Sequence, residues 1–294
     1  MDSHFLESLI KVVEFGSIAR AAKAQHLTAA AVGQRIAILE TQLGAKLLDR
    51  SSREATPTEA CLRLLPRARH VVRELRDMKD SIAPDGLTGR FRIGTIAAAL
   101  VGILPSAVRK LSEIAPGLTL EIKLGSSESL YADLDEHFID AAVLILPGFD
   151  LPSVFEVNVL REEPLVLLSR NCKRMNRLEK LSKNPYIQYD SRSWGGRSAL
   201  QYLKDNNLEL KPFCEFDTPQ PIEKLVAEGM GVSLVPLWTG FNKERTDLDH
   251  EIIREKRYRR KMAIITHQNS TRNLLNKTVV EALQASANSN SKIS

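Results

Sequence analysis

The chain has 294 residues, of which 43% are hydrophobic and 26% charged, with a formal net charge of +5. This length exceeds the usual size of one domain, so two or three domains are expected. No run of about 18 apolar residues occurs, and Glu7 and Glu14 stand where a signal peptide would be apolar. These features exclude a membrane protein and lead us to expect a cytoplasmic one.

Cysteines and histidines give no sign of catalysis. Cys61, Cys172 and Cys214 are too few and too scattered for a disulfide scaffold, and no CxxC pair is present. The sequence favours buried small hydrophobic residues, with a redox switch as the alternative. The six histidines form no HxxxH pair, and no GxSxG motif or Walker lysine loop occurs. We therefore expect no enzyme, no metal and no cofactor.

The basic excess lies in the N-terminal quarter of the chain. Residues 1–76 hold 12 Lys and Arg against 8 Asp and Glu, whereas the remainder is nearly balanced. A local excess of this size is compatible with nucleic-acid binding and equally with a solvated surface. The choice between nucleic-acid binding and a solvated surface therefore depends on the helices predicted in this region.

Three short helices are predicted at the start of the chain. Apolar residues at helical spacing indicate a helix over 2–15. Ser17 suits the N-cap of an alanine-rich helix over 18–25, and Thr28 suits that of a third helix ending at Gly44. Such closely packed short helices are typical of a helix-turn-helix, although any small helical bundle fits the pattern.

The third helix has two distinct faces. Its core-facing stripe consists of Val32, Ile36, Leu39 and Leu43. Its opposite face carries Ala30, Gln34, Ala37 and Thr41. Gln34 is the long polar side chain of the first two exposed turns, and glutamine can pair bidentately with adenine. Methyl contacts to thymine and DNA shape are expected to add to specificity.

A short basic segment, KLLDRSSREATPT over 46–58, has no helical period. It is typical of a two-stranded wing that places Arg50 and Arg53 beside the third helix. An ordinary polar hairpin is the alternative. The flanking helices favour the interpretation as a DNA-binding wing.

A long helix is predicted over 58–82, with a kink near Leu65 because Pro66 removes a backbone hydrogen bond. Interrupted at Lys79, its apolar residues alternate in steps of four and three, as in a coiled-coil seam: Cys61, Leu65, Ala68, Val72, Leu75 and Ile82. A helix cannot bury such a stripe by itself. We therefore expect the same helix of a second subunit to cover it and form a homodimer.

Turn-forming residues over 83–89, APDGLTG, predict a hinge. Beyond it, strands alternate with helices in two similar sets, which predicts two α/β lobes, the first with a parallel sheet. The expected strands are RFRIGTI, LTLEIKL, DAAVLIL, FEVNVL, PLVLLSR, PYIQYD, FCEF, GVSLVP and KMAIIT. The expected helices cover 103–114, 128–138, 198–206, 222–228 and 271–285. The last strand and helix can return the chain to the first lobe.

The most basic segment is REKRYRRK, residues 254–261. The favoured interpretation is a solvated strand or loop, because only Tyr258 is interleaved for base stacking. Contact with flanking DNA or with a partner subunit is the alternative.

The phrases FGSIARAA, ILETQLGAKLLDR and TPTEA together resemble the winged helix-turn-helix of LysR-type transcriptional regulators. The length, the linker helix, the two lobes and the phrase AEGMGVSLVP extend the resemblance over the whole chain. It implies a multidomain fold: an all-α winged helix-turn-helix and a linker helix, then a two-lobed α/β effector domain resembling periplasmic binding proteins. The expected domains are 1–58 (DNA-binding), 59–89 (linker helix and hinge) and 90–294 (effector-binding), with lobe I at about 90–160 and 267–294 and lobe II at about 161–266.

The resemblance also implies a function: sequence-specific regulation of transcription on double-stranded DNA, controlled by a small organic effector between the lobes. Linker-helix dimers commonly assembled as tetramers are implied, and RNA polymerase is a candidate partner. The sequence departs from the family at Ala29, Ala30 and Gly33, where the recognition helix usually starts with polar residues, and at Cys61, where a glycine is usual. The DNA-binding candidates are Ser17, Arg20, Thr28, Ala29, Ala30, Gly33, Gln34, Arg35, Lys46, Arg50 and Arg53.

Open α/β sheets bind ligands at the carboxyl ends of their strands, where helix N-termini present backbone N–H groups. By this rule, and by the resemblance, the effector-binding candidates are Thr95, Ile96, Ala97, Ala98, Gly125, Ser126, Ser127, Leu146, Tyr189 and Thr218, beside Pro147, Asp190 and Arg192. Each serine or threonine is equally well explained as a helix cap. We expect a carboxylate as the anchoring group of the effector. An architectural DNA-binding protein without an effector, or an α/β enzyme with an accessory DNA-binding domain, are the alternatives.

Overall fold

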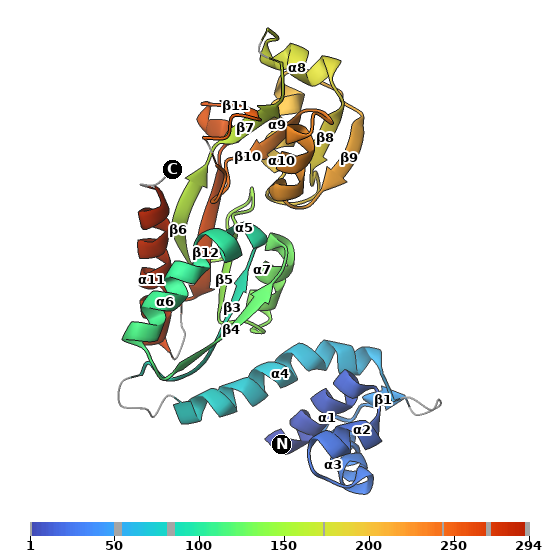
Figure 1. Cartoon of the computed structure of the whole chain (residues 1–294). Helices are drawn as coiled ribbons and strands as arrows, with labels where there is room; N and C mark the ends of the chain where they lie inside the picture. The colour runs from blue at the N-terminus through green and yellow to red at the C-terminus, as the bar shows by residue number, and fades with distance from the viewer. Residues whose placement is uncertain are drawn as a thin grey trace. The chain divides into compact units, whose positions relative to one another are not determined.

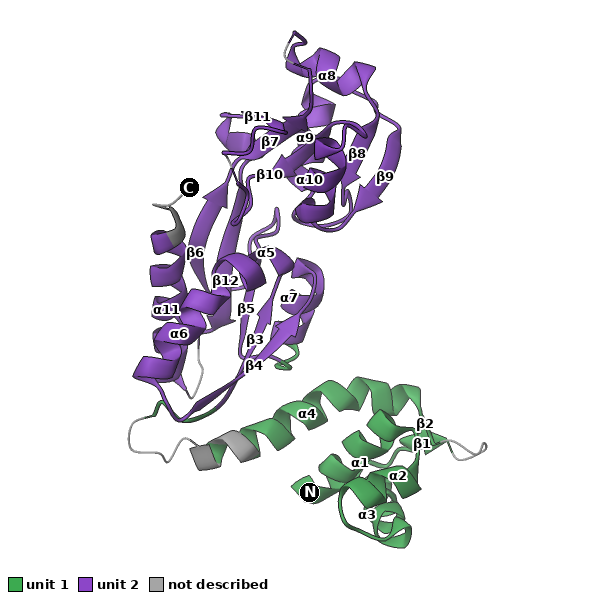
Figure 2. Ribbon diagram, in the orientation of Figure 1, with its two compact units in different colours: residues 1–89, 135–138 green, residues 90–134, 139–294 purple. Residues whose placement is uncertain are grey.

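The structure is a computed structural model that describes residues 2–49, 55–80, 86–172, 174–242, 244–268 and 272–291. Figure 1 shows its helices and strands in chain order. Two compact units are present, residues 1–89 with 135–138 and residues 90–134 with 139–294 (Figure 2). None of the described helices is long and apolar enough to cross a membrane.

Three helices open the first unit: α1 (Ser3–Phe15), α2 (Ile18–Ala24) and α3 (Ala29–Leu43). Gly16 and Gly44 follow α1 and α3 with φ angles of 61° and 63°, in the left-handed region that favours glycine. Thr28 Oγ1 accepts a hydrogen bond from the Ala31 N–H at 3.1 Å. The three helices predicted from the sequence are therefore confirmed, and so are the caps at Thr28 and Gly44.

A short hairpin follows α3. Strands β1 (Leu48–Asp49) and β2 (Thr56–Pro57) pair antiparallel, with Leu48 opposite Pro57. The two-stranded wing predicted from the sequence is confirmed. Its tip, with Arg50 and Arg53, lies outside the described residues.

Helix α4 (Glu59–Asp80) runs through Pro66 and packs against α1. Most of the predicted seam is buried in the core that α4 forms with α1, α2 and α3 of the same chain: Cys61, Leu65, Ala68 and Val72. The expectation that a second subunit covers these residues is wrong, because the stripe has the same period whichever neighbour buries it. Leu75 differs, being 43% exposed, and Ile82 lies outside the described residues.

The first lobe of the second unit contains a five-stranded sheet in the order β4-β3-β5-β12-β6. Its strands are β3 (Gly89–Thr95), β4 (Leu118–Leu124), β5 (Ala141–Ile145), β6 (Phe155–Glu163) and β12 (Arg260–His267). β3 and β5 are parallel, but β12 is antiparallel to both β5 and β6. The sheet is therefore mixed, not parallel as expected, because the returning chain enters it between β5 and β6. The chain re-enters the first lobe at Arg260, where β12 begins, and not at residue 267, where the boundary was expected.

Helices cover both faces of this sheet: α5 (Ala97–Gly102), α6 (Leu104–Ile114), α7 (Ser127–Asp135) and α11 (Asn273–Ser291). On one face, Leu130 and Leu134 of α7 pack in a core with Ala142 and Leu144 of β5. On the other, α6 and α11 lie side by side (Figure 1). The helix expected over 103–114 corresponds to α6, whereas α5, which precedes it, was not expected from the sequence.

The second lobe has two small sheets. β7 (Leu165–Ser169) lies antiparallel between β10 (Ser233–Pro236) and β11 (Asp249–Ile252), and β8 (Tyr186–Tyr189) is parallel to β9 (Pro212–Phe216). Its helices are α8 (Arg177–Lys183), α9 (Arg197–Asp205), α10 (Pro219–Ala227) and the 3-10 helix η1 (Lys256–Tyr258). α8 and β11 were not expected from the sequence.

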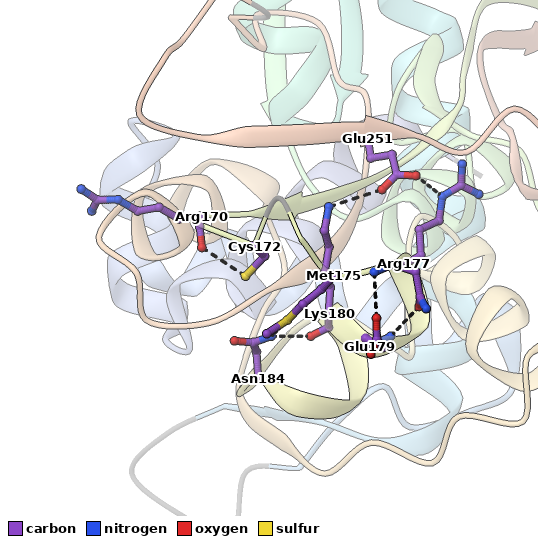
Figure 3. A network of polar contacts seen from close by, with 9 residues as sticks. Arg170, Cys172, Met175, Arg177, Glu179, Lys180, Asn184 and Glu251 are labelled. Atoms are coloured by element: carbon purple, nitrogen blue, oxygen red, sulfur yellow. Dashed lines mark hydrogen bonds and ion pairs between the residues drawn. The ribbon is translucent and has the colours of Figure 1, made fainter.

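Polar contacts hold α8 on β11. Asn176 and Glu179 form a reciprocal capping box, in which each side chain accepts the backbone N–H of the other at 3.0–3.1 Å. Glu251 of β11 then pairs with Arg177 at 2.6 Å and with Lys180 at 3.5 Å (Figure 3). This ion-pair network contains no candidate site residue, and it positions α8 on β11.

Candidate nucleic-acid interface and ligand cleft

The outward face of α3 is nearly free of large side chains. Ala29, Ala30 and Gln34 are exposed, and Gly33 is half-buried. A Cβ built on Gly33 would meet no atom within 4 Å, so packing inside the chain does not require this glycine. Glycine inside a helix costs about 0.5–1 kcal/mol relative to alanine. The glycine keeps this face of α3 free of side-chain atoms at this position.

The other DNA-binding candidates among the described residues of the first unit differ in whether their side chains already have a structural role. Ser17 and Thr28 act as N-caps, while Arg20 is exposed. Arg35 is partly engaged inside the unit, because its Nη1 donates to Ser8 Oγ at 3.2 Å.

Glu40 is a buried carboxylate at the end of α3 that the sequence analysis missed. It accepts hydrogen bonds from the backbone N–H groups of Leu47 at 2.8 Å and Leu48 at 3.3 Å. Lys46 Nζ lies 3.3 Å away, although the Lys46 side chain is 83% exposed. Burial alone would raise the pKa of Glu40, but these hydrogen bonds and the Lys46 charge hold it below its usual range. The carboxylate thus fixes the start of the wing to α3.

A cleft of about 380 Å³ lies between the two lobes of the second unit, a volume within the range of small-molecule sites. It is lined by the ends of the strands and the starts of the helices that follow them, as the strand-end rule predicts. The predicted residues that the structure brings together there are Ile96, Ala97, Ala98, Gly125, Ser126, Ser127, Tyr189 and Thr218. Their role in binding stays a prediction.

Four of the predicted residues do not line the cleft. Thr95 is fully buried at the end of β3, and its Oγ1 donates to the Ile96 carbonyl at 3.3 Å. Leu146 lines a different pocket, together with Pro147. Arg192 is exposed and is not part of the lining.

The hydroxyl groups of the cleft fall into two classes. Ser126 caps α7, since its Oγ accepts from the Ser129 N–H at 3.2 Å. Ser127 is buried and accepts from the Ile145 N–H at 3.1 Å. Thr218 is the N-cap of α10 but makes no side-chain capping bond. Of these three, Thr218 has the side chain that is most available to a ligand.

The lining also includes charged residues, among them Asp190, Asp217 and Arg260. Arg260 belongs to the basic run that was expected to be solvated. That interpretation is wrong for Tyr258 and Arg260, which are only 1% and 6% exposed. The period of two along a strand was the missed signal, because it places Arg260 on the same face as Met262 of β12.

Arg260 lies where the chain returns between the lobes. Its Nε donates to Glu163 Oε2 at 2.8 Å, and its Nη1 donates to the Tyr189 hydroxyl at 3.0 Å. Burial would lower the pKa of Arg260, but the Glu163 charge raises it, so the guanidinium stays protonated. Glu163 Oε1 is buried and accepts no hydrogen bond from the described residues. Arg260 therefore connects β12 of the first lobe with β8 of the second lobe beside the cleft.

The three cysteines line neither this cleft nor the Leu146 pocket. Cys61 and Cys172 are buried, and Cys214 is half-buried. Burial raises the pKa of the Cys61 thiol to about 11, which keeps it in the unreactive thiol form. This agrees with the interpretation of Cys61 as a small hydrophobic residue.

Comparison with known proteins decides the class of the chain. The LysR substrate binding domain matches residues 84–288, and the bacterial regulatory helix-turn-helix of the lysR family matches residues 4–62. The chain belongs to the LysR family. It is a DNA-binding transcriptional regulator with a substrate-binding domain, and the family is one of regulators, not of enzymes.

Individual relatives of this LysR-family regulator are moderately similar. The transcriptional regulator CzcR of Bacillus cereus is 28% identical over 241 residues, which are 80% of each chain. A full-length OxyR from Pseudomonas aeruginosa has a TM-score of 0.70 at 17% identity, covering 97% of this chain and 95% of that one. Full-length CbnR in complex with its target DNA has a TM-score of 0.68 at 19% identity, covering 97% and 100%. These two structures share the fold.

Proposed function

We propose that this regulator reads base pairs with the outward face of α3 and that a small polar effector in the cleft controls its action on DNA. The observation that carries the first part is Gln34, an exposed side chain able to pair with adenine, beside the small residues Ala30 and Gly33. The small neighbours let the helix approach the floor of the major groove closely. Exposed Arg20 and Lys46 are suited to phosphate contacts.

The DNA part is tested by selecting duplexes from a random library with the wild-type protein and measuring their affinity by fluorescence anisotropy. Gln34→Ala is expected to relax preference at one base pair per half-site, because a bidentate pair is worth about 1–3 kcal/mol. Gln42→Ala makes the same chemical change near the other end of α3 and is the control. Equal losses on selected and random DNA for Gln34→Ala would exclude it as a base reader.

The charge of the cleft refines the expected effector. Asp190 and Asp217 line it, while the positive charge of Arg260 is already paired with Glu163. This lining does not favour the simple carboxylate ligand expected from the sequence. We propose a small molecule with a hydrogen-bond donor, such as an amino or hydroxyl group, for the two carboxylates. Its acceptor would meet the Thr218 hydroxyl at the start of α10.

A homodimer through α4 remains part of the proposal, with a different seam. Val71, Leu75 and Met78 are 44%, 43% and 60% exposed and fall at i, i+4 and i+7 on the helix. A second copy of α4 would bury this stripe. Pairing of such dimers into a tetramer is the assembly that we propose for the regulator in the cytoplasm.

A further inference from the structure

A second pocket, of about 650 Å³, is lined by the chain after β5, by the start of α9 and by the basic run. Its volume falls in the range of small-molecule sites. The pocket shares Arg260 with the cleft, but its other lining residues are different. Neither the cleft nor the DNA-reading helix accounts for it.

The lining of this second pocket is strongly basic. Its cations are Arg197, Arg257, Arg259, Arg260 and Lys261, and the only carboxylate among its lining residues is Asp150. Arg259 and Lys261 reach Glu162 only at 3.8 Å, longer than the 2.7–2.9 Å of a strong charge-assisted bond. Their hydrogen-bonding capacity is therefore only loosely occupied.

Arg257 pairs with Asp205 at 3.3 Å, whereas Arg197 forms none of the ion pairs found among the described residues of this lobe. Its Nη1 packs over Gly148, where a built Cβ would collide with it. The glycine therefore leaves the space in which the guanidinium sits. An unpaired arginine held at the edge of a basic pocket is suited to receive a carboxylate or phosphate from a ligand.

One wall of the pocket is aromatic. The rings of Phe149 and Trp194 meet edge-on, with centroids 5.7 Å apart, and Phe149 is 54% exposed. The backbone N–H of Trp194 donates to Glu128 at 2.6 Å, which fixes its position. An exposed aromatic ring beside several cations is suited to a ligand that has both an anionic group and a flat apolar part.

We propose that this pocket binds a small organic anion with an aromatic ring, at a site separate from the effector cleft. The anionic group contacts Arg197 and the loosely paired Arg259, and the ring packs on Phe149 and Trp194. This inference does not depend on which effector occupies the cleft.

The test uses phenyl phosphate and the full-length protein carrying Trp238→Phe, which leaves Trp194 as the single tryptophan of the chain. Binding should change Trp194 fluorescence in a saturable way. Inorganic phosphate, which lacks the ring, and phenol, which lacks the charge, should each bind at least about tenfold more weakly. No saturable change up to about 10 mM phenyl phosphate would overturn the proposal, since a specific site of this kind should reach millimolar affinity.

Variants locate the site. Arg197→Ala should weaken phenyl phosphate binding by about tenfold or more, and Gly148→Ala should act in the same direction by displacing the guanidinium. Arg254→Ala removes an equal charge from the exposed start of the basic run, outside the pocket, and should leave binding unchanged.

Three results would contradict the proposal. Equal losses for Arg254→Ala and Arg197→Ala would mean that only the general charge of the surface matters. Loss with Thr218→Val and not with Arg197→Ala would place the ligand in the cleft. If duplex DNA, and not phenyl phosphate, altered Trp194 fluorescence, the surface would be a DNA contact.

Discussion

Arg260 and Glu163 lie opposite each other on β12 and β6, and their side chains form a buried ion pair where the chain passes between the two lobes. The guanidinium also contacts the Tyr189 hydroxyl at the end of β8. Arg260 thus joins β12 of the first lobe to β8 of the second at the edge of the cleft. Its charges stabilise each other at a place where neither would be tolerated alone.

Removing one member of this pair should be costly. Arg260→Gln removes the cation that hydrogen-bonds Glu163 and leaves only Arg161, at 3.9 Å, as a counter-charge, so the free energy of unfolding should fall by about 3 kcal/mol in urea titrations. The double variant Arg260→Met/Glu163→Leu should recover most of this loss, because both charges of the buried pair are removed together. A single variant that is as stable as the wild type would show that the pair does not hold the lobes.

Leu75→Asp should disrupt the subunit contact without unfolding the chain, because Leu75 is exposed on α4. Light scattering should then show a monomer with an unchanged thermal midpoint. Val72→Asp, only three positions away, buries a charge in the core with α1 and should unfold the first unit. A dimer that persists in Leu75→Asp and Met78→Asp would exclude the exposed stripe of α4 as the interface.

Glu40→Gln should destabilise the first unit by about 1–3 kcal/mol, since a charged acceptor of two backbone N–H groups is lost. Because the pKa of Glu40 is lower in the folded chain, its contribution is present above the unfolded-state pKa of about 4.3. It is lost as the pH falls through the lower folded-state pKa. The difference between the urea midpoints at pH 7 and at pH 3 should therefore be smaller in Glu40→Gln than in the wild type.

Glu14→Gln is the control for this measurement, because Glu14 forms an exposed pair with Lys11. Surface pairs of this kind contribute little to stability. If Glu14→Gln and Glu40→Gln had equal effects, the wing would not depend on the buried carboxylate.

Gly33→Ala should stabilise the first unit by about 0.5–1 kcal/mol, because alanine is the better helix former and the added Cβ meets no atom of the chain. It should at the same time weaken binding to selected DNA, since the methyl group fills the space through which α3 approaches the groove. Thermal unfolding and anisotropy titration on the same sample separate the two effects. Increased stability with unchanged DNA affinity would mean that DNA does not approach Gly33 closely.

The sequence was most informative where local signals decide the structure. Capping residues such as Thr28 and Gly44 bounded the recognition helix correctly. The rule that ligands meet the carboxyl ends of strands brought Ser126 and Thr218 to one cleft, although they lie far apart in the chain.

Long-range contacts account for what the sequence did not reveal. Periodicity identified the buried face of α4 at Val72 but not the neighbour that buries it, which is α1 and not a second subunit. Arg260 was hidden in a run of like charges, and its place beside Glu163 depends on β12 entering the first sheet. No local signal indicated Glu40, because its partners at Leu47 and Leu48 meet it only after the chain turns at Gly44.

Effector-controlled DNA binding is tested most directly by measuring DNA bending with and without a cleft ligand. Calorimetry with amino and hydroxy metabolites would first identify a compound that binds the wild type and loses affinity in both Asp217→Asn and Thr218→Val. Adding this compound should change the fluorescence-energy-transfer bend angle of a bound duplex in the wild type and leave it unchanged in the two variants at the same concentration. A bend angle that no such ligand alters in the wild type would contradict control through the cleft and favour an architectural DNA-binding protein.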